Sequence, residues 1–122
     1  MYKRFEDLKV WQEARKFRQG IYNLVKKFPK KELYGLTAQI SHSASSITAN
    51  IAEGYGRYHW QENIQFCRIS RGSINETLDH LYTALDCGYI TEEEFSEHYQ
   101  KGRQLEQLLN GYIRYLEKRK NV

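Results

Sequence analysis

Proline and glycine are scarce in this chain. Its 122 residues include one Pro and eight Gly, too few for the many turns of an all-β sandwich or a doubly wound α/β sheet. No stretch approaches the run of about eighteen apolar residues that a transmembrane helix needs. With 40% hydrophobic residues, a chain of this length can bury a core. We therefore expect an all-α protein that forms one domain over residues 1–122.

Cysteines are also few and far apart. Cys67 and Cys87 fall in one predicted helix, where a rise of about 1.5 Å per residue separates them by about 30 Å. That distance excludes a disulfide within the chain, and unpaired thiols suit a reducing compartment. The charged residues between Met1 and Asp7 stand where a signal peptide needs an apolar run. The expected location is cytoplasmic.

Motifs for catalysis and for metal or cofactor binding are missing. The chain lacks Cys-x-x-Cys, His-Glu-x-x-His, a phosphate-binding glycine loop and Gly-x-Ser-x-Gly. No Glu is followed three residues later by His, as a di-iron bundle requires. An inward-facing Glu53 or Glu76 near Asn50 is the remaining catalytic alternative, but a structural role at a helix end explains Asn50 and Glu53 better. We predict no catalytic residue, no metal site and no cofactor.

Apolar residues recur at helical spacing in four segments. Proline, glycine and a capping box set the predicted limits, which are an end at Phe28-Pro29 for the first helix, residues 32–56 for the second, residues 60–88 with Gly88 as cap for the third, and a start at Thr91 for the fourth. The stripes expected in the core are Val10, Ala14, Phe17, Ile21, Leu24 and Phe28; Leu33, Leu36, Ile40, Ala44, Ile47 and Ile51; Ile64, Cys67, Ile74, Leu78, Leu81 and Leu85; and Phe95, Tyr99, Gly102, Leu105, Leu109, Tyr112 and Leu116. Short connections predict an antiparallel up-down-up-down four-helix bundle.

Small residues predict where the helices approach each other closely. Residues 41–52 are rich in Ser, Ala and Thr, which allow two backbones to come together. Gly72 lies inside the third predicted helix, where glycine costs roughly 1 kcal/mol relative to alanine. Close packing against a neighbouring helix is our interpretation of this glycine.

Charge is distributed unevenly. Residues 1–31 hold ten Lys or Arg and three acids, whereas residues 73–99 hold seven acids and no Lys or Arg. The bases of the first helix lie off its apolar stripe, so they form either a phosphate-attracting face or an ordinary solvated surface. Residues 55–60 combine three aromatic rings with an Arg and a His, which suits stacking on exposed bases or packing at the bundle end. Residues 114–120 allow the same two interpretations.

Five ordered motifs are distributed between residues 5 and 90. They are Phe5-x-x-Leu8-x-Val10-Trp11-Gln12, Phe28-Pro29-x-x-Glu32-x-Tyr34-Gly35-Leu36-Thr37-x-Gln39-Ile40, Asn50-Ile51-Ala52-Glu53-Gly54-x-Gly56-Arg57, Gly72-Ser73-x-x-Glu76 and Gly88-Tyr89-Ile90. Together they resemble the 23S ribosomal RNA intervening-sequence protein family. The resemblance implies a four-helix bundle with no known catalytic activity.

This fold is similar to that of the accessory variability proteins of diversity-generating retroelements. That resemblance implies a homopentamer that binds RNA or DNA through a basic surface, with a reverse transcriptase or ribonucleoprotein as partner. The candidate nucleic-acid-binding residues are Arg15, Lys16, Lys26, Lys27 and Arg57. Two departures from the family pattern, Ser41-His42 for a basic pair and Thr48 for a proline, remove positive charge and a helix kink.

We expect a non-catalytic, oligomeric bundle that binds nucleic acid as an accessory factor. One alternative is a protein-interaction scaffold, in which the acidic segment from Glu76 to Glu97 meets basic helices of neighbouring subunits. The other is a vestigial, insertion-encoded protein with no partner.

Overall fold

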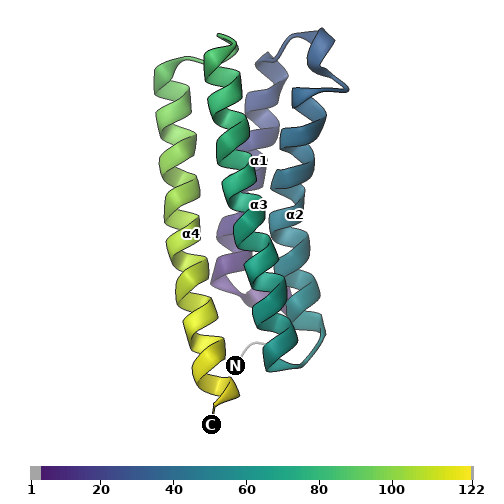
Figure 1. Cartoon of the computed structure of the whole chain (residues 1–122), viewed down its shortest axis with the longest axis vertical. Coiled ribbons are helices and arrows are strands. Elements are labelled where there is room, and N and C mark those ends of the chain that lie inside the picture. Colours follow the sequence, from purple (N-terminus) through teal and green to yellow (C-terminus); the bar gives the residue numbers. More distant parts are fainter. Residues whose placement is uncertain (1–3, 122) are drawn as a thin grey trace.

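A computed structural model describes residues 4–121 and contains four long helices side by side (Figure 1). The elements are η1 Phe5–Asp7, α1 Lys9–Leu24, η2 Val25–Lys27, η3 Lys30–Glu32, α2 Leu36–Gly56, α3 Trp60–Asp86 and α4 Glu92–Lys120. Successive helices run antiparallel. The α1–α2 connection and the α3–α4 loop form one end, here called the upper end, and the α2–α3 connection and the last turns of α4 form the lower end. The predicted all-α four-helix bundle is confirmed.

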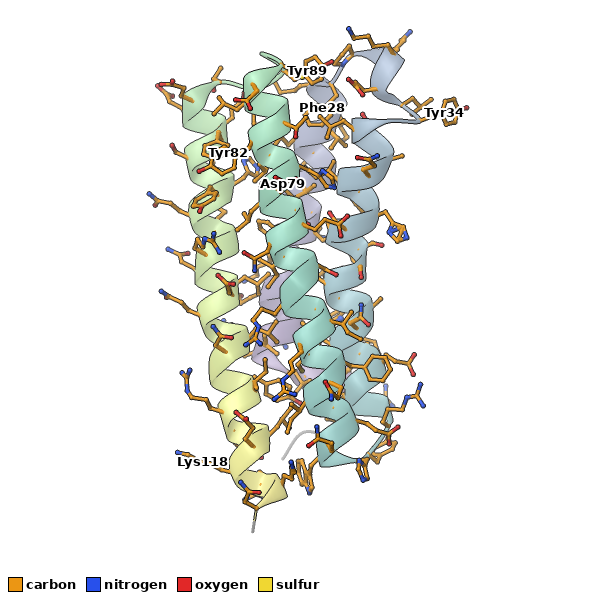
Figure 2. All side chains as sticks on the ribbon, in the orientation of Figure 1. Phe28, Tyr34, Asp79, Tyr82, Tyr89 and Lys118 are labelled. Carbon is orange, nitrogen blue, oxygen red and sulfur yellow. The ribbon has the colours of Figure 1, made fainter. Side chains whose placement is uncertain are left out.

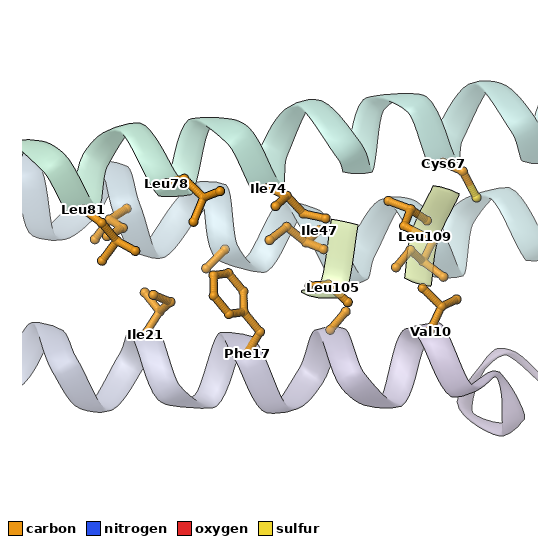
Figure 3. Close-up of a cluster of buried hydrophobic side chains, with 14 of the residues drawn as sticks. Val10, Phe17, Ile21, Ile47, Cys67, Ile74, Leu78, Leu81, Leu105 and Leu109 are labelled. Carbon is orange, nitrogen blue, oxygen red and sulfur yellow. The ribbon is translucent and has the colours of Figure 1, made fainter. Parts of the chain in front are cut away.

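The core consists of the apolar stripes of the four helices (Figure 3). All six stripe residues of the first segment are buried, and the large side chains that are 0% exposed include Ile21, Ile47, Ile74, Leu81 and Leu109. On α4 the predicted aromatic positions are partly buried against this core. The prediction was wrong for Leu33, which is 55% exposed.

The late start of α2 explains the exposure of Leu33. The Glu32 side chain accepts a hydrogen bond from the backbone N–H of Leu36 (3.0 Å), which satisfies one of the free N–H groups at the helix start. Residues 30–32 form a 3-10 turn instead of the first turn of α2. Phe28 is extended (φ −71°, ψ 147°), as Pro29 requires, so α1 has already ended in the 3-10 turn η2.

The ends of α2 and α3 differ from each other. Gly88 has φ +76°, and the N–H groups of Gly88 and Tyr89 donate to the last carbonyls of α3 at 3.0 and 2.9 Å, so the predicted cap is confirmed. The glycines near the end of α2 do not form a cap of this kind. The helix continues through Gly56, and the left-handed residue that follows is Tyr58 (φ 52°).

Helices α2 and α3 pack against each other more extensively than any other pair of helices in the bundle. Hydroxyl groups join them at three levels, with Ser43 Oγ 2.7 Å from Thr77 Oγ1, Ser73 donating to Ser46 (2.9 Å) and Ser70 donating to the Ile47 carbonyl (2.8 Å). The small residues therefore do permit close approach. The interpretation of Gly72 was wrong, because a Cβ at this exposed position would meet nothing within 4 Å.

A hydrogen bond between Tyr89 and Glu32 ties the α3–α4 loop to the α1–α2 connection. The Tyr89 hydroxyl donates to Glu32 Oε2 at 2.7 Å, and the ring lies 5.7 Å from that of Phe28 (Figure 2). This bond, followed by that from the Leu36 N–H, lowers the pKa of Glu32, and it raises the pKa of Tyr89 to about 12. The upper end is therefore held by an ionised carboxylate.

Replacing Tyr89 with Phe should lower the stability of the bundle at neutral pH more than at acidic pH. A lowered carboxylate pKa contributes stability above the unfolded-state value, near 4.5, and that contribution disappears as the pH falls through the folded-state value. Urea unfolding at pH 7 and pH 3 measures the difference. Tyr34→Phe is the matched control, because Tyr34 is 92% exposed. An equal loss at both pH values would contradict the role of ionised Glu32.

Candidate nucleic-acid interface

The five predicted nucleic-acid-binding residues do not form one patch. Arg15 and Lys16 are exposed in the middle of α1. Lys26 and Lys27 are exposed at the upper end, and Arg57 follows α2 at the lower end. Arg57 is therefore separated from Lys26 and Lys27 by the length of α2.

Four of these five residues have partners within the chain. Their contacts are Arg15 over the Trp11 ring (6.0 Å), Lys16 with Glu13 (3.1 Å), Lys27 with Glu94, and Arg57 with Glu53 (3.0 Å) and the Phe66 ring (5.0 Å). The bond from Lys27 is the main cause of the lowered pKa of Glu94. Lys26 is the only one of the five for which residues 4–121 provide neither an ion pair nor an aromatic ring contact.

Lys30 and Lys31 extend the positive charge beyond Lys26. Both are exposed on η3, and, as for Lys26, the described residues offer them no ion pair. We call Lys26, Lys30 and Lys31 the upper-end lysines. The Glu32 carboxylate beside them accepts hydrogen bonds from the Tyr89 hydroxyl and from the backbone N–H of Leu36 at the start of α2. These three cations are therefore the ones available to an external anion at this end.

Tyr34 stands next to the upper-end lysines. Its side chain is 92% exposed and projects away from the bundle (Figure 2). Lys30, Lys31 and Tyr34 were not among the predicted site residues. The two lysines fall between the first and second predicted helices, and Tyr34 falls in the first turn predicted for the second. The two adjacent lysines after Pro29 were the available signal, since a proline-led turn exposes its side chains.

Acidic residues occupy the neighbouring corner of the upper end. Asp86, Glu92 and Glu93 are exposed around the α3–α4 loop, and within residues 4–121 none of them forms an ion pair. Lys27 and Glu94 join the basic and acidic corners. The upper end therefore carries unpaired charges of both signs side by side.

Residues 55–60, the aromatic segment at the lower end, were predicted either to stack on bases or to pack against the bundle end. Tyr55 is partly buried against the core, whereas Tyr58 is 84% and Trp60 44% exposed. His59 caps α3 by accepting a hydrogen bond from the Glu62 N–H (3.3 Å). This segment thus both packs against the bundle and presents free aromatic surface.

The residues considered for catalysis have structural contacts. Asn50 donates to the carbonyl and hydroxyl oxygens of Ser46 at 2.8 and 2.9 Å, and Ser46 in turn accepts from α3. Glu53 and Glu76 are exposed and pair with Arg57 and His80. Neither carboxylate faces the bundle interior, so the structure offers no support for an acid-base pair there.

The thiol of Cys67 is buried in the core, which raises its pKa to about 12 and leaves it an inert packing group. Among residues 4–121, no three His, Cys, Asp or Glu side chains gather closely enough to hold a metal ion. No helix in the described part of the chain has the length and apolar character needed to cross a bilayer.

Comparison with known proteins places the chain in a family. Residues 6–111 match the model of the 23S rRNA-intervening sequence protein family. A solved structure from Bacteroides thetaiotaomicron, a protein of unknown function from the S23 ribosomal protein family, is similar with a TM-score of 0.78 and 27% identity, covering 85% of this chain and 97% of its own. No curated protein matches the sequence. Since the family match spans most of the chain and the solved relative has the same fold, this protein belongs to the 23S rRNA-intervening sequence protein family.

Proposed function

We propose that this protein is a non-catalytic accessory factor that binds RNA or DNA through the upper-end lysines. The observation that carries the proposal is that none of the three forms an ion pair within residues 4–121, whereas most of the other predicted cations are paired within the chain. An unpaired lysine can contact a phosphate, and so release a counterion from the nucleic acid, without first losing an ion pair within the protein. The family description, which refers to 23S rRNA, supports a nucleic-acid setting.

The local structure supports phosphate binding by these three residues. Lys30 and Lys31 stand on a 3-10 turn whose position is fixed by the Glu32 contacts to Leu36 and Tyr89. A rigid turn places flexible lysine side chains near one another at little entropic cost to the backbone. Lysine binds phosphate as a point charge, with little demand on geometry. We therefore expect binding that depends on salt more than on base sequence.

A triple variant tests this function. Lys26→Gln, Lys30→Gln and Lys31→Gln together should weaken binding of a labelled RNA hairpin or DNA duplex at least tenfold, and should reduce the salt slope by about 0.9 for each lost phosphate contact. The measurement is a titration of nuclease-treated protein at several salt concentrations.

The control for this test has the same change in net charge. Lys9→Gln, Lys16→Gln and Lys101→Gln remove three lysines that already pair with Glu13 or Glu97, so this variant should bind almost as the unchanged protein does. Equal losses in the two variants would refute a localised site. Absence of binding at low salt would refute the function itself.

Assembly with further copies of the chain is the second candidate function. The adjacent basic and acidic corners of the upper end favour it, because opposite charges on one subunit suit head-to-tail contacts with the next. The resemblance to the accessory variability proteins supports a pentamer. Native mass is therefore measured for both triple variants, and an oligomer that dissociates only in the upper-end variant would favour the scaffold role over nucleic-acid binding.

A further inference from the structure

A pocket of about 750 Å³ lies at the lower end, between the α2–α3 connection and the last turns of α4. Exposed rings from both segments line it, since Tyr58 is 84% exposed and Trp60 and Tyr115 are each 44% exposed. Tyr55 and Tyr112 form its inner wall, where they pack partly against the core. Aromatic surfaces from several directions suit a planar ligand that stacks.

Tyr58 is placed in this pocket at a cost to the backbone. Its φ of 52° lies in the left-handed region, which favours glycine over a residue with a Cβ. Within residues 4–121, the exposed ring has one ring contact, with Tyr55 at 6.1 Å. Packing therefore offsets little of the strain. Strained residues of this kind gather at sites where the side chain contacts a ligand.

An arginine also lines this pocket. Arg119 lines it with its guanidinium 5.6 Å from the centre of the Tyr115 ring. Lys118 and Lys120 flank Arg119 in the last turn of α4, and no acid of residues 4–121 forms an ion pair with these three residues. The pocket thus combines stacking surface with positive charge for a phosphodiester chain.

We propose that this pocket binds unpaired bases of single-stranded nucleic acid, with Tyr58, Trp60 and Tyr115 stacking on the bases and Arg119 contacting the backbone. Exposed aromatic rings beside positive charge are the features that bind single strands with little sequence preference. In a duplex the bases stack on one another, so their faces are not available to these rings. The inference rests on the proposed function, to which it adds the form of nucleic acid and a second surface.

Trp60 provides a direct probe of this pocket. The chain has two tryptophans, so Trp11→Phe leaves Trp60 as the only one. In that background, we titrate an oligothymidine single strand and a DNA duplex of the same length at low salt. The single strand should quench Trp60 fluorescence on binding, and the duplex should not.

Two variants test the tyrosines separately. Tyr58→Gly relieves the backbone strain, so it should keep or raise the melting temperature while weakening single-strand binding roughly tenfold and leaving duplex binding unchanged. Tyr115→Leu should also weaken single-strand binding. Tyr22→Leu is its control, because Tyr22 is a similarly exposed helix-surface tyrosine (39%) outside the pocket.

The outcomes separate this inference from the proposed function. Duplex binding without Trp60 quenching by the single strand would overturn the pocket alone, as would equal quenching by both ligands or normal single-strand binding in both tyrosine variants. Single-strand binding with normal quenching in the upper-end lysine variant would support the pocket even if the upper-end lysines proved unnecessary. No binding of either ligand at low salt would overturn both.

Discussion

Replacing Gly54 with Ala should destabilise the bundle by about 1–3 kcal/mol, although alanine is favoured over glycine in a helix interior by roughly 1 kcal/mol. A Cβ at position 54 would lie 2.8 Å from Phe66 Cβ and 2.8 Å from Asn63 Oδ1. The Phe66 Cβ is fixed to the backbone of α3 and cannot move aside by rotating a side chain. The two helices would therefore have to separate, which would strain the hydroxyl contacts between them.

Gly72→Ala is the matched control for this prediction. Its Cβ would meet nothing within 4 Å, so the variant should be more stable by roughly 1 kcal/mol because alanine reduces the entropy of the unfolded chain. Urea unfolding of the two variants measures changes of opposite sign. A neutral or stabilising Gly54→Ala would mean that α2 and α3 are not as closely packed at the lower end as the structure indicates.

Ile47→Ala should cost about 2–5 kcal/mol of unfolding free energy. Ile47 is 0% exposed and lies beside Ile74 in the core of the bundle (Figure 3). Truncation removes three carbons from the core and leaves a cavity, because neighbouring helices joined by buried hydrogen bonds cannot collapse freely into the space. The measurement is urea unfolding. The dependence of the unfolding free energy on urea concentration should be the same in the variant and the unchanged protein, which confirms that both unfold in the same transition.

Ile69→Ala makes the same chemical change on the surface of α3. Ile69 is 53% exposed, so its truncation should alter stability by less than about 0.5 kcal/mol. A loss from Ile69→Ala as large as that from Ile47→Ala would contradict the exposure of Ile69 in solution. Unfolding at several protein concentrations would then reveal burial by a second copy, because the stability of an oligomer depends on concentration.

The helices and most of the core were predictable because their signals are local. The spacing of apolar residues identifies a buried face, and the capping box at Thr91 is confirmed by the reciprocal bonds between Thr91 and Glu94. Leu33 was misassigned because its exposure depends on Glu32 capping a helix that begins later. Gly72 was misassigned because a glycine that allows close packing and one that faces solvent have the same sequence spacing.

The candidate site was predictable only in part. Sequence identifies the cations, and the pair between Lys16 and Glu13 joins near neighbours in the chain. Lys27 pairs instead with Glu94 of α4, which is distant in the sequence. The lower-end pocket likewise joins Tyr58 to Tyr115, which stand more than fifty residues apart. Such contacts depend on how the helices are arranged around one another, which the spacing of apolar residues within one helix does not predict.

The unequal packing of the helix pairs has a consequence for how the bundle opens. α2 and α3 pack against each other most extensively. α1 is the shortest of the four helices, and its contact with α4 is the least extensive of those between neighbouring helices. Local opening follows the contacts with the lowest free energy. We therefore expect backbone amides of α1 to exchange with solvent deuterium before those of α2 and α3, and the α2–α3 pair to remain folded until global unfolding.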